Sequence, residues 1–308
     1  MWPIAVIAAF FLAGCMKDED PSQRGEHSTP PPSNSSNNNS PQNIKPSVSP
    51  IRDEYKNSVR DAVVSQLQNS DYVFIGESHA VKEEGFFSPM MKAFYAAGAR
   101  TLAVEMATHE QAGLDTLSRT GKVDPNLFPN HTQVMAWPEF QGLYRAAAQA
   151  GLKLLAVDQP SHLRSSPAKR EQYIAEHLMS SGGKTLVWMG AIHSMNLQKP
   201  YPTARGILQN NGVTTSSMVL ESATLLRFEN SFHLGISASA FQTYFMQPPV
   251  SSFAYPARQL DLSTIVALPT GSHEEVTQTL PYVQLVDYIA FLSTQDGGDA
   301  GRTNRWNF

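Results

Sequence analysis

The chain has 308 residues, of which 41% are hydrophobic and 16% charged, and its formal net charge is −4 at pH 7. This length is enough to bury a substantial hydrophobic core. Its 23 Lys and Arg residues form no long basic run, so there is no electrostatic case for nucleic acid as a partner.

The N-terminus has the pattern of a bacterial lipoprotein signal. Residues 2–14 are apolar or small, a stretch too short to span a bilayer as a mature helix but suited to a signal-peptide core. The run Leu12-Ala-Gly-Cys15 resembles a lipobox, in which the chain is cut before the cysteine and that cysteine is lipid-modified. We therefore expect residues 1–15 to be a signal and Cys15 to anchor the protein in the membrane of a bacterial cell envelope. The alternative, a cysteine buried in a helix, lacks any amphipathic periodicity after Cys15. Met16 stands where an inner-membrane retention signal would have Asp, which favours the outer membrane.

Residues 16–50 are rich in Pro, Ser, Asn and charged side chains. Such a segment cannot bury enough apolar area to fold, so we expect a flexible tether. Residues 51–308 are expected to form one α/β domain that stands off the membrane.

Apolar runs that alternate with helical patterns predict the secondary structure of this domain. Tyr55, Val59, Val63 and Leu67 recur four apart, which indicates a helix over about 53–68. The expected strands, of which the last closes the sheet, cover residues 72–76, 101–105, 152–157, 185–190, 214–220 and 284–292. The expected helices between them run through residues 86–95, 108–119, 138–150, 167–180 and 203–210. Strands joined by helices favour right-handed crossovers and an open, mostly parallel sheet with helices on both faces.

Four of these strands end in an acid or a histidine. Glu77 and His79 follow the first strand, Glu105 ends the second, Asp158 the third, and His193 follows the fourth. Ligands of open α/β sheets bind beyond the carboxyl ends of the strands, so these five side chains are expected to converge on one site.

The local motifs suit acid–base or metal chemistry. In Gly76-Glu77-Ser78-His79 the glycine allows a sharp turn, and an extended backbone aims Glu77 and His79 to the same side. A carboxylate beside an imidazole can hold a proton for general acid–base catalysis or share a cation. Alternatively, His79 is a helix cap and Glu77 a solvated loop residue. A second Gly-x-x-His, from Gly190 to His193, strengthens the functional interpretation.

Glu105 ends an apolar strand, where an unpaired carboxylate would be costly. It therefore needs a cation, a donor or a titratable partner, and a purely structural salt bridge to Arg100 or Arg205 is the alternative to a functional role. Asp158 precedes a Gln-Pro pair and also suits an ordinary turn. Weaker candidates near the strand ends are His109, His162 and Arg205.

Five segments carry a resemblance to a known family. In chain order they are residues 76–79, 104–115, Trp137, 148–160 and 190–193, within about 71–211. Their order and spacing resemble the ChaN-like haem-binding-uptake family, which is grouped with the erythromycin esterases and the Tiki/TraB proteins. These proteins share a Gly-Glu-x-His, a strand-end Glu and a Gly-x-x-His. Asp158 departs from the pattern, since ChaN-like proteins usually have Asn there.

The resemblance implies two functions, of which haem binding is placed first. ChaN-like members are iron-regulated lipoproteins that bind haem, which agrees with the lipobox at Cys15. By this resemblance, haem or another iron-containing ligand is bound through His79, His193 and Arg205. Tyr201 is a further candidate for an axial ligand.

The second implied function is hydrolysis, because Tiki-type relatives are metal-dependent proteases and erythromycin esterases hydrolyse a lactone. Glu77, His79, Glu105 and His193 are then the catalytic residues, acting on water directly or through a divalent metal. A Zn, Mn or Co ion would be held by His79, Glu105, His193 and Asp158. The sequence has no His-Glu-x-x-His, so this enzyme is not a zincin. A third interpretation is a non-catalytic scaffold whose polar strand ends satisfy one another.

Overall fold

The computed structural model describes residues 52–77, 81–131, 134–163, 166–221, 235–236, 249–260, 263–269 and 275–296. The expected signal and tether lie outside this part of the chain, as do His79 and the residues after 296. The lipid anchor at Cys15 therefore stays a prediction.

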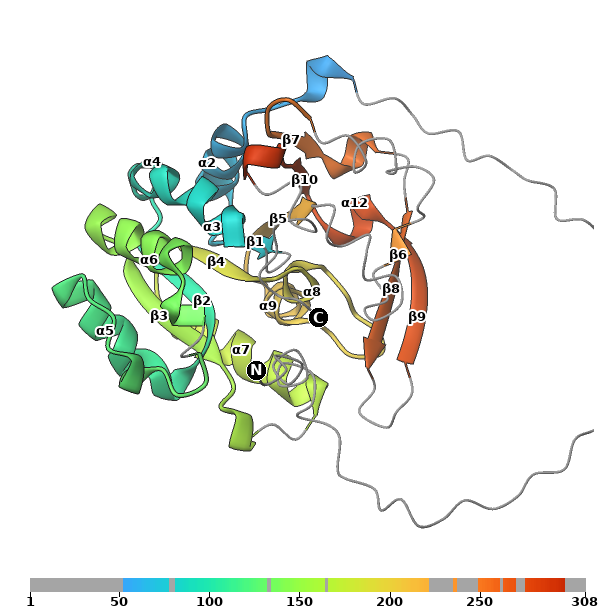
Figure 1. The fold of residues 1–308 in the computed structure, drawn as a ribbon. Helices are drawn as coiled ribbons and strands as arrows, with labels where there is room; N and C mark the ends of the chain where they lie inside the picture. Colours follow the sequence, from blue (N-terminus) through green and yellow to red (C-terminus); the bar gives the residue numbers. More distant parts are fainter. Residues whose placement is uncertain are drawn as a thin grey trace, which may run out of the picture.

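A seven-stranded sheet forms the centre of the domain, in the order β3-β2-β4-β1-β5-β10-β7 (Figure 1). Its strands are β1 (Tyr72–Glu77), β2 (Thr101–Ala107), β3 (Lys153–Asp158), β4 (Thr185–Gly190), β5 (Thr215–Glu221), β7 (Phe253–Pro256) and β10 (Tyr288–Phe291). Neighbouring strands pair in parallel except β7, which runs antiparallel to β10. A separate antiparallel sheet joins β6 (Gly235–Ile236), β8 (Ser263–Pro269) and β9 (Glu275–Pro281). The expected α/β class with a mostly parallel sheet is confirmed.

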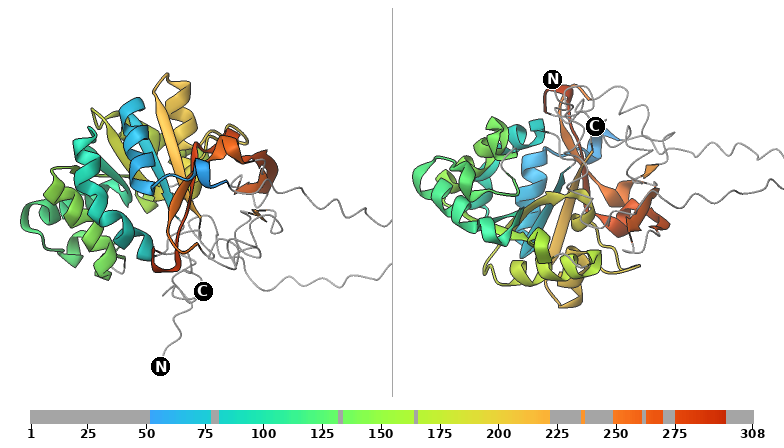
Figure 2. Two further views of the ribbon diagram at one scale, coloured as in Figure 1. Left: turned by 90° about the horizontal axis from the view of Figure 1, so that it is seen from above. Right: turned by 60° about the horizontal axis from the view of Figure 1, so that its bottom comes forward.

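Helices cover both faces of the large sheet (Figure 2). One layer contains α2 (Val59–Asn69), α3 (Val81–Phe87), α4 (Met91–Ala96), α5 (Gln111–Thr120) and α6 (Pro138–Ala150). The other contains α7 (Pro167–Met179) and α9 (Ala204–Asn210), while the single turns α8 (Ala191–Ser194) and α12 (Tyr282–Leu285) follow β4 and precede β10. Short 3-10 turns occupy Asp53–Tyr55, Ser88–Met90, Thr108–Glu110, Pro125–Leu127, Val134–Ala136, Ser161–Leu163, Ala257–Gln259 and Thr294–Asp296. Among the helices described, none has both the length and the apolar character needed to cross a membrane.

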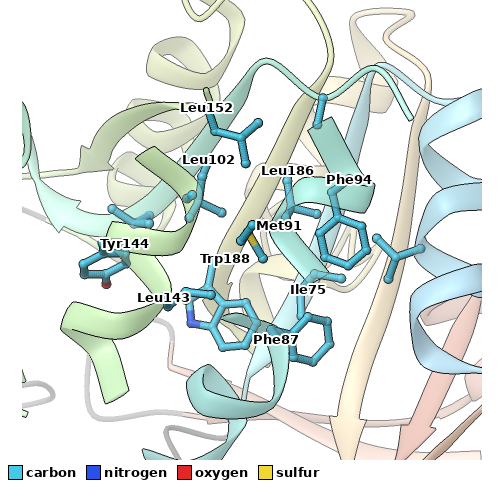
Figure 3. Close-up of a cluster of buried hydrophobic side chains, with 14 of the residues drawn as sticks. Ile75, Phe87, Met91, Phe94, Leu102, Leu143, Tyr144, Leu152, Leu186 and Trp188 are labelled. Atoms are coloured by element: carbon cyan, nitrogen blue, oxygen red, sulfur yellow. The ribbon is translucent and has the colours of Figure 1, made fainter. Parts of the chain in front are cut away.

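Strand residues alternate between two hydrophobic cores. Ile75 packs in the core beneath α2–α6, whereas its neighbour Phe74 packs with Ile174 of α7. Figure 3 shows the first core, where the ring centroid of Trp188 lies 5.1 Å from that of Phe87. Because both faces of these strands are buried, their sequences read as continuous apolar runs.

Two helices differ from the sequence expectation at identifiable residues. The helix expected from residue 53 begins at Val59, where the Ser58 hydroxyl accepts the N–H of Asp61 at 3.0 Å and caps the first turn. The helix expected through 86–95 is divided into α3, a 3-10 turn and α4. Pro89 lies at the division, since proline lacks the N–H that would continue the helix.

The expected strand 284–292 is wrong in its first part. Leu285 ends α12, and the Asp287 carboxylate accepts a hydrogen bond from Arg205 Nη2 at 2.6 Å, so the strand begins only at Tyr288. This strand does not close the sheet, because β7 pairs beyond it as the edge strand.

Candidate functional site

Four parallel strand ends meet at one edge of the sheet. β3, β2, β4 and β1 are consecutive neighbours, and their register aligns Glu77 with Gly190 and the end of β2 with Asp158. Glu105 lies near the end of β2, and His193 follows β4 within α8. Among the described residues, Glu77, Glu105, Asp158 and His193 therefore lie at the same edge of the sheet, as predicted from their positions at strand ends.

A guanidinium joins two of these strand ends. Arg170, near the start of α7, donates from Nη2 to Glu105 Oε1 at 2.5 Å, and from Nε and Nη2 to the two oxygens of Asp158 at 2.7 and 2.8 Å. Only 20% of the Arg170 side chain is exposed. Burial alone would lower the pKa of Arg170, but the charges of Glu105 and Asp158 raise it above its ordinary value. Arg170 is therefore a permanent cation between β2 and β3.

His193 lies between two carboxylates. Its Nδ1 is 2.6 Å from Glu171 Oε1, and its Nε2 is 3.4 Å from Glu105 Oε1. Backbone groups fix both acids, because Glu171 accepts the N–H of Ala204 and Glu105 that of Gly190, each at 2.7 Å. Burial by itself would lower the pKa of His193, but the charges of Glu171 and Glu105 outweigh it and raise the pKa to about 10. At neutral pH His193 is an imidazolium.

The arginines that the sequence linked to this region have other roles. Arg205 is buried and donates to Asp287, to the hydroxyl of Ser217 at 2.6 Å and to a backbone carbonyl, which ties α9 to β5. Arg100 donates to the carbonyl of Tyr95 at 3.0 Å, and its guanidinium lies 4.5 Å from the Tyr95 ring centroid. For Glu105, the alternative of a salt bridge to Arg100 or Arg205 gives way to the contact with Arg170.

Carboxyl groups from β1 and α3 form a second buried cluster. Glu83 and Glu84 have no exposed surface, and Glu77 is 5% exposed. In the described part of the chain, neither carboxyl oxygen of Glu84 has a hydrogen-bond partner, so its charged form would be costly. Burial, and then the charges of Glu77 and Glu83, raise the pKa of Glu84 well above its ordinary value. Folding therefore favours the protonated form of Glu84. Burial and the charges of Glu77 and Glu84 likewise raise the pKa of Tyr144 well above its usual range.

Replacing Glu84 with Gln is expected to stabilise the protein by about 1 kcal/mol at pH 8. When folding raises the pKa of an acid, that acid contributes most to the free energy of unfolding below its unfolded-state pKa. This contribution falls as the pH rises toward the folded-state pKa. The Gln amide has a similar shape and does not titrate, so the gain in the free energy of unfolding over wild type should grow from pH 5 to pH 8. Urea unfolding across this range measures it. Glu176→Gln, at an exposed position on α7, is the control and should show no such trend. An equal gain at both pH values would contradict the protonated Glu84.

The close approach of α8 to β1 depends on Gly76. A Cβ at this position would lie 2.2 Å from the Ser194 hydroxyl oxygen and 2.9 Å from Cα of Ala191. We expect Gly76→Ala to lower the free energy of unfolding by about 1–3 kcal/mol and to displace the turn that carries His193. Gly85→Ala is the matched control, because a Cβ there meets nothing within 4 Å and alanine favours the helix. Urea unfolding of both variants tests this, and equal effects would contradict it.

The described side chains do not fit a resident metal ion at this edge. Glu105 and Asp158 already share the guanidinium of Arg170, and both ring nitrogens of His193 face carboxylates as a cation. Within the described ranges, no group of three or more His, Cys, Asp or Glu side chains is arranged to hold a metal. His193 and Arg205 do not suit haem either. An imidazolium has no lone pair to coordinate iron, and the Arg205 guanidinium already donates hydrogen bonds within the protein.

Fold and site together define an α/β protein with a buried, charge-compensated cluster at its strand ends. No protein-family model and no curated protein matches the sequence. Solved structures with a similar fold include a Bacillus cereus protein, with a TM-score of 0.49 and 10% identity over 74% of this chain and 90% of that one. A succinoglycan biosynthesis protein has a TM-score of 0.47 and 13% identity over 76% of this chain and 97% of that one. ChaN of Campylobacter jejuni, described as binding haem cofacially, has a TM-score of 0.39 and 14% identity over 54% of this chain and 86% of that one. These are likenesses of fold alone, and membership of the ChaN-like family stays a prediction from the sequence motifs.

Proposed function

We propose that the chain is a hydrolase that works by acid–base chemistry at the carboxyl edge of the sheet. The observation that carries the proposal is His193, a buried imidazolium held between Glu105 and Glu171 by contacts of 3.4 and 2.6 Å. Titratable groups with shifted pKa values occur at catalytic sites more often than elsewhere, and the environments of a catalytic acid and a catalytic base push their pKa values apart. Structural ion pairs shift pKa values too, so activity itself is the test.

The two clusters together contain the two proton positions that hydrolysis requires. Water attacks a carbonyl carbon while a carboxylate takes its proton, and an acid then protonates the leaving group as the carbon–heteroatom bond breaks. Glu77 is the candidate base, and the imidazolium of His193 is the candidate acid. Glu77 ends β1, and His193 lies in the turn α8 that directly follows β4, the neighbour of β1. The substrate class that suits this arrangement is a carboxylic ester, lactone or amide, whose carbonyl oxygen gains negative charge near the cations Arg170 and His193.

The decisive experiment is hydrolysis by the purified full chain of a panel that starts with 4-nitrophenyl acetate and includes a lactone and a peptide. We expect His193→Gln and Glu105→Gln to lower kcat by about 10²–10⁴-fold. His177→Gln is the matched control, because His177 is stacked on Tyr173 at 4.0 Å and lies outside the cluster. Activity that survives His193→Gln at the wild-type level would overturn the proposal.

A haem-binding lipoprotein is the second candidate, and it rests on the sequence motifs from Gly76 to His193 and on the lipobox at Cys15. In that case a cell-envelope protein is anchored by acylated Cys15, and His79, which lies outside the described residues, is the axial candidate. A haemin titration of the full chain separates the two. A saturable Soret shift that His79→Ala abolishes and His193→Gln leaves intact would favour haem binding over hydrolysis.

A further inference from the structure

The two strands that carry Glu105 and Asp158 repeat one pattern, an acid followed four residues later by a histidine. Glu105 is followed by His109, and Asp158 by His162. β2 and β3 are parallel neighbours, and each continues into a short 3-10 turn, Thr108–Glu110 or Ser161–Leu163. The two turns therefore bring together histidines that lie far apart in sequence. Their ring centroids are 6.4 Å apart and both side chains are exposed.

His109 is held in place by a chain of contacts that the proposed hydrolysis does not use. Glu110 is fully buried, pairs with His131 Nδ1, and accepts the backbone N–H of Asn130 at 2.8 Å and of His131 at 3.2 Å. These bonds fix the Asn130 backbone beside the turn. The Asn130 side-chain amide in turn contacts Nε2 of His109 at 3.2 Å. The amide nitrogen donates, so Nε2 of His109 is the acceptor and carries the lone pair, while the ring hydrogen is on Nδ1.

We propose that His109 and His162 form a two-histidine site for a divalent transition-metal ion, at the rim of the strand ends and separate from the Arg170 cluster. Imidazole nitrogens favour Zn²⁺, Cu²⁺ or Ni²⁺ over Mg²⁺ and Ca²⁺, which take oxygen ligands. Two exposed rings at this separation need only side-chain rotation to place one nitrogen each at about 2.0–2.1 Å from a shared ion. Water fills the other coordination positions. The Asn130 amide donates to the lone pair of Nε2 in the metal-free protein, so the ion takes the place of this hydrogen bond when it binds.

The test is Zn²⁺ binding by equilibrium dialysis, using the full chain with Cys15→Ser in every sample so that the thiol does not compete. One Zn²⁺ per chain is expected for the parent. His109→Gln and His162→Gln should each weaken binding at least about 10-fold, whereas Asn130→Ala should not weaken it, because the Asn130 amide competes for the lone pair of His109 Nε2. His177→Gln is the control and should bind as the parent does. Cu²⁺ EPR of the parent should show two coupled nitrogens, and one in each single-histidine variant.

Two results would overturn the site. One is an absence of saturable Zn²⁺ binding by the parent. The other is binding that His109→Gln or His162→Gln reduces no more than His177→Gln does, which would place the ion on other residues. Both histidines are exposed, so their variants should fold, and an unchanged far-UV CD spectrum confirms this.

Discussion

Arg170→Met is expected to lower the free energy of unfolding by about 3–5 kcal/mol at pH 7. The substitution keeps most of the side-chain volume but removes the cation that contacts both Glu105 and Asp158. Asp158 is 1% exposed, so its charge cannot be rehydrated without opening the structure. Removing one partner of a buried ion pair costs far more than the pair contributes, because the charge left behind was already taken out of water. Urea denaturation of the full chain measures the loss.

The control removes the charges that Arg170 compensates. In a background of Glu105→Gln and Asp158→Asn, Arg170→Met should cost less than about 1.5 kcal/mol, since the two buried carboxylates that it contacts are then neutral. Arg119→Met, at an exposed position on α5, should cost close to nothing. If Arg170→Met costs as much in the double-variant background as in wild type, its role is packing rather than charge compensation.

Much of the fold could be predicted because the central strands are buried on both faces. β1 to β4 are mostly apolar runs. The expected bounds of β4 match the observed ones, and those of β1, β2, β3 and β5 differ by one or two residues. The late strand was harder, because residues 285–292 are apolar except for Asp287. The apolar side chains of Leu285 and Val286 pack in a core as part of a turn, and no hydrophobic pattern separates that turn from a strand. Only Asp287, which binds Arg205, marks the boundary.

Only part of the candidate site could be predicted from the sequence, and the residue types at each position explain why. Strand-end acids and histidines stand out because a polar side chain interrupts an apolar run. Arg170, Glu171 and Glu84 lie on helices, where charged residues are common, so they were missed. A signal was present for two of them. Glu171 occupies the buried stripe that continues as Ile174, Ala175 and Leu178.

Glu84, on the other side of the sheet, likewise occupies a position in the buried stripe of its helical segment. It begins a spacing of three, four and three residues that continues through Phe87, Met91 and Phe94, all of which are buried in one core. An acid at a core position of a helix must be protonated, paired or bonded to the backbone. Searching amphipathic helices for such acids would have located both carboxyl groups from sequence alone.

The stabilising effect of His193 is expected to disappear as pH rises from about 6.5 to about 10. Folding raises the pKa of His193 to about 10, so the imidazolium contributes its full stability below the unfolded pKa and loses it as pH approaches the folded value. His193→Gln should therefore lower the free energy of unfolding at pH 6.5 by on the order of 3 kcal/mol, and by much less at pH 10. Other groups with raised pKa values, such as Glu84, act equally in both proteins and cancel in the difference.

Urea unfolding of wild type and His193→Gln at several pH values measures this difference, with His177→Gln as the control. A difference that narrows toward pH 10 means that His193 is charged in the folded protein, so it donates a proton in the proposed reaction. A difference that stays constant means that His193 is neutral when folded. It would then accept a proton, and the roles of His193 and Glu77 in hydrolysis would be exchanged. The pH dependence of the free energy of unfolding of His193→Gln, compared with wild type, therefore shows whether His193 donates or accepts the proton before any substrate is known.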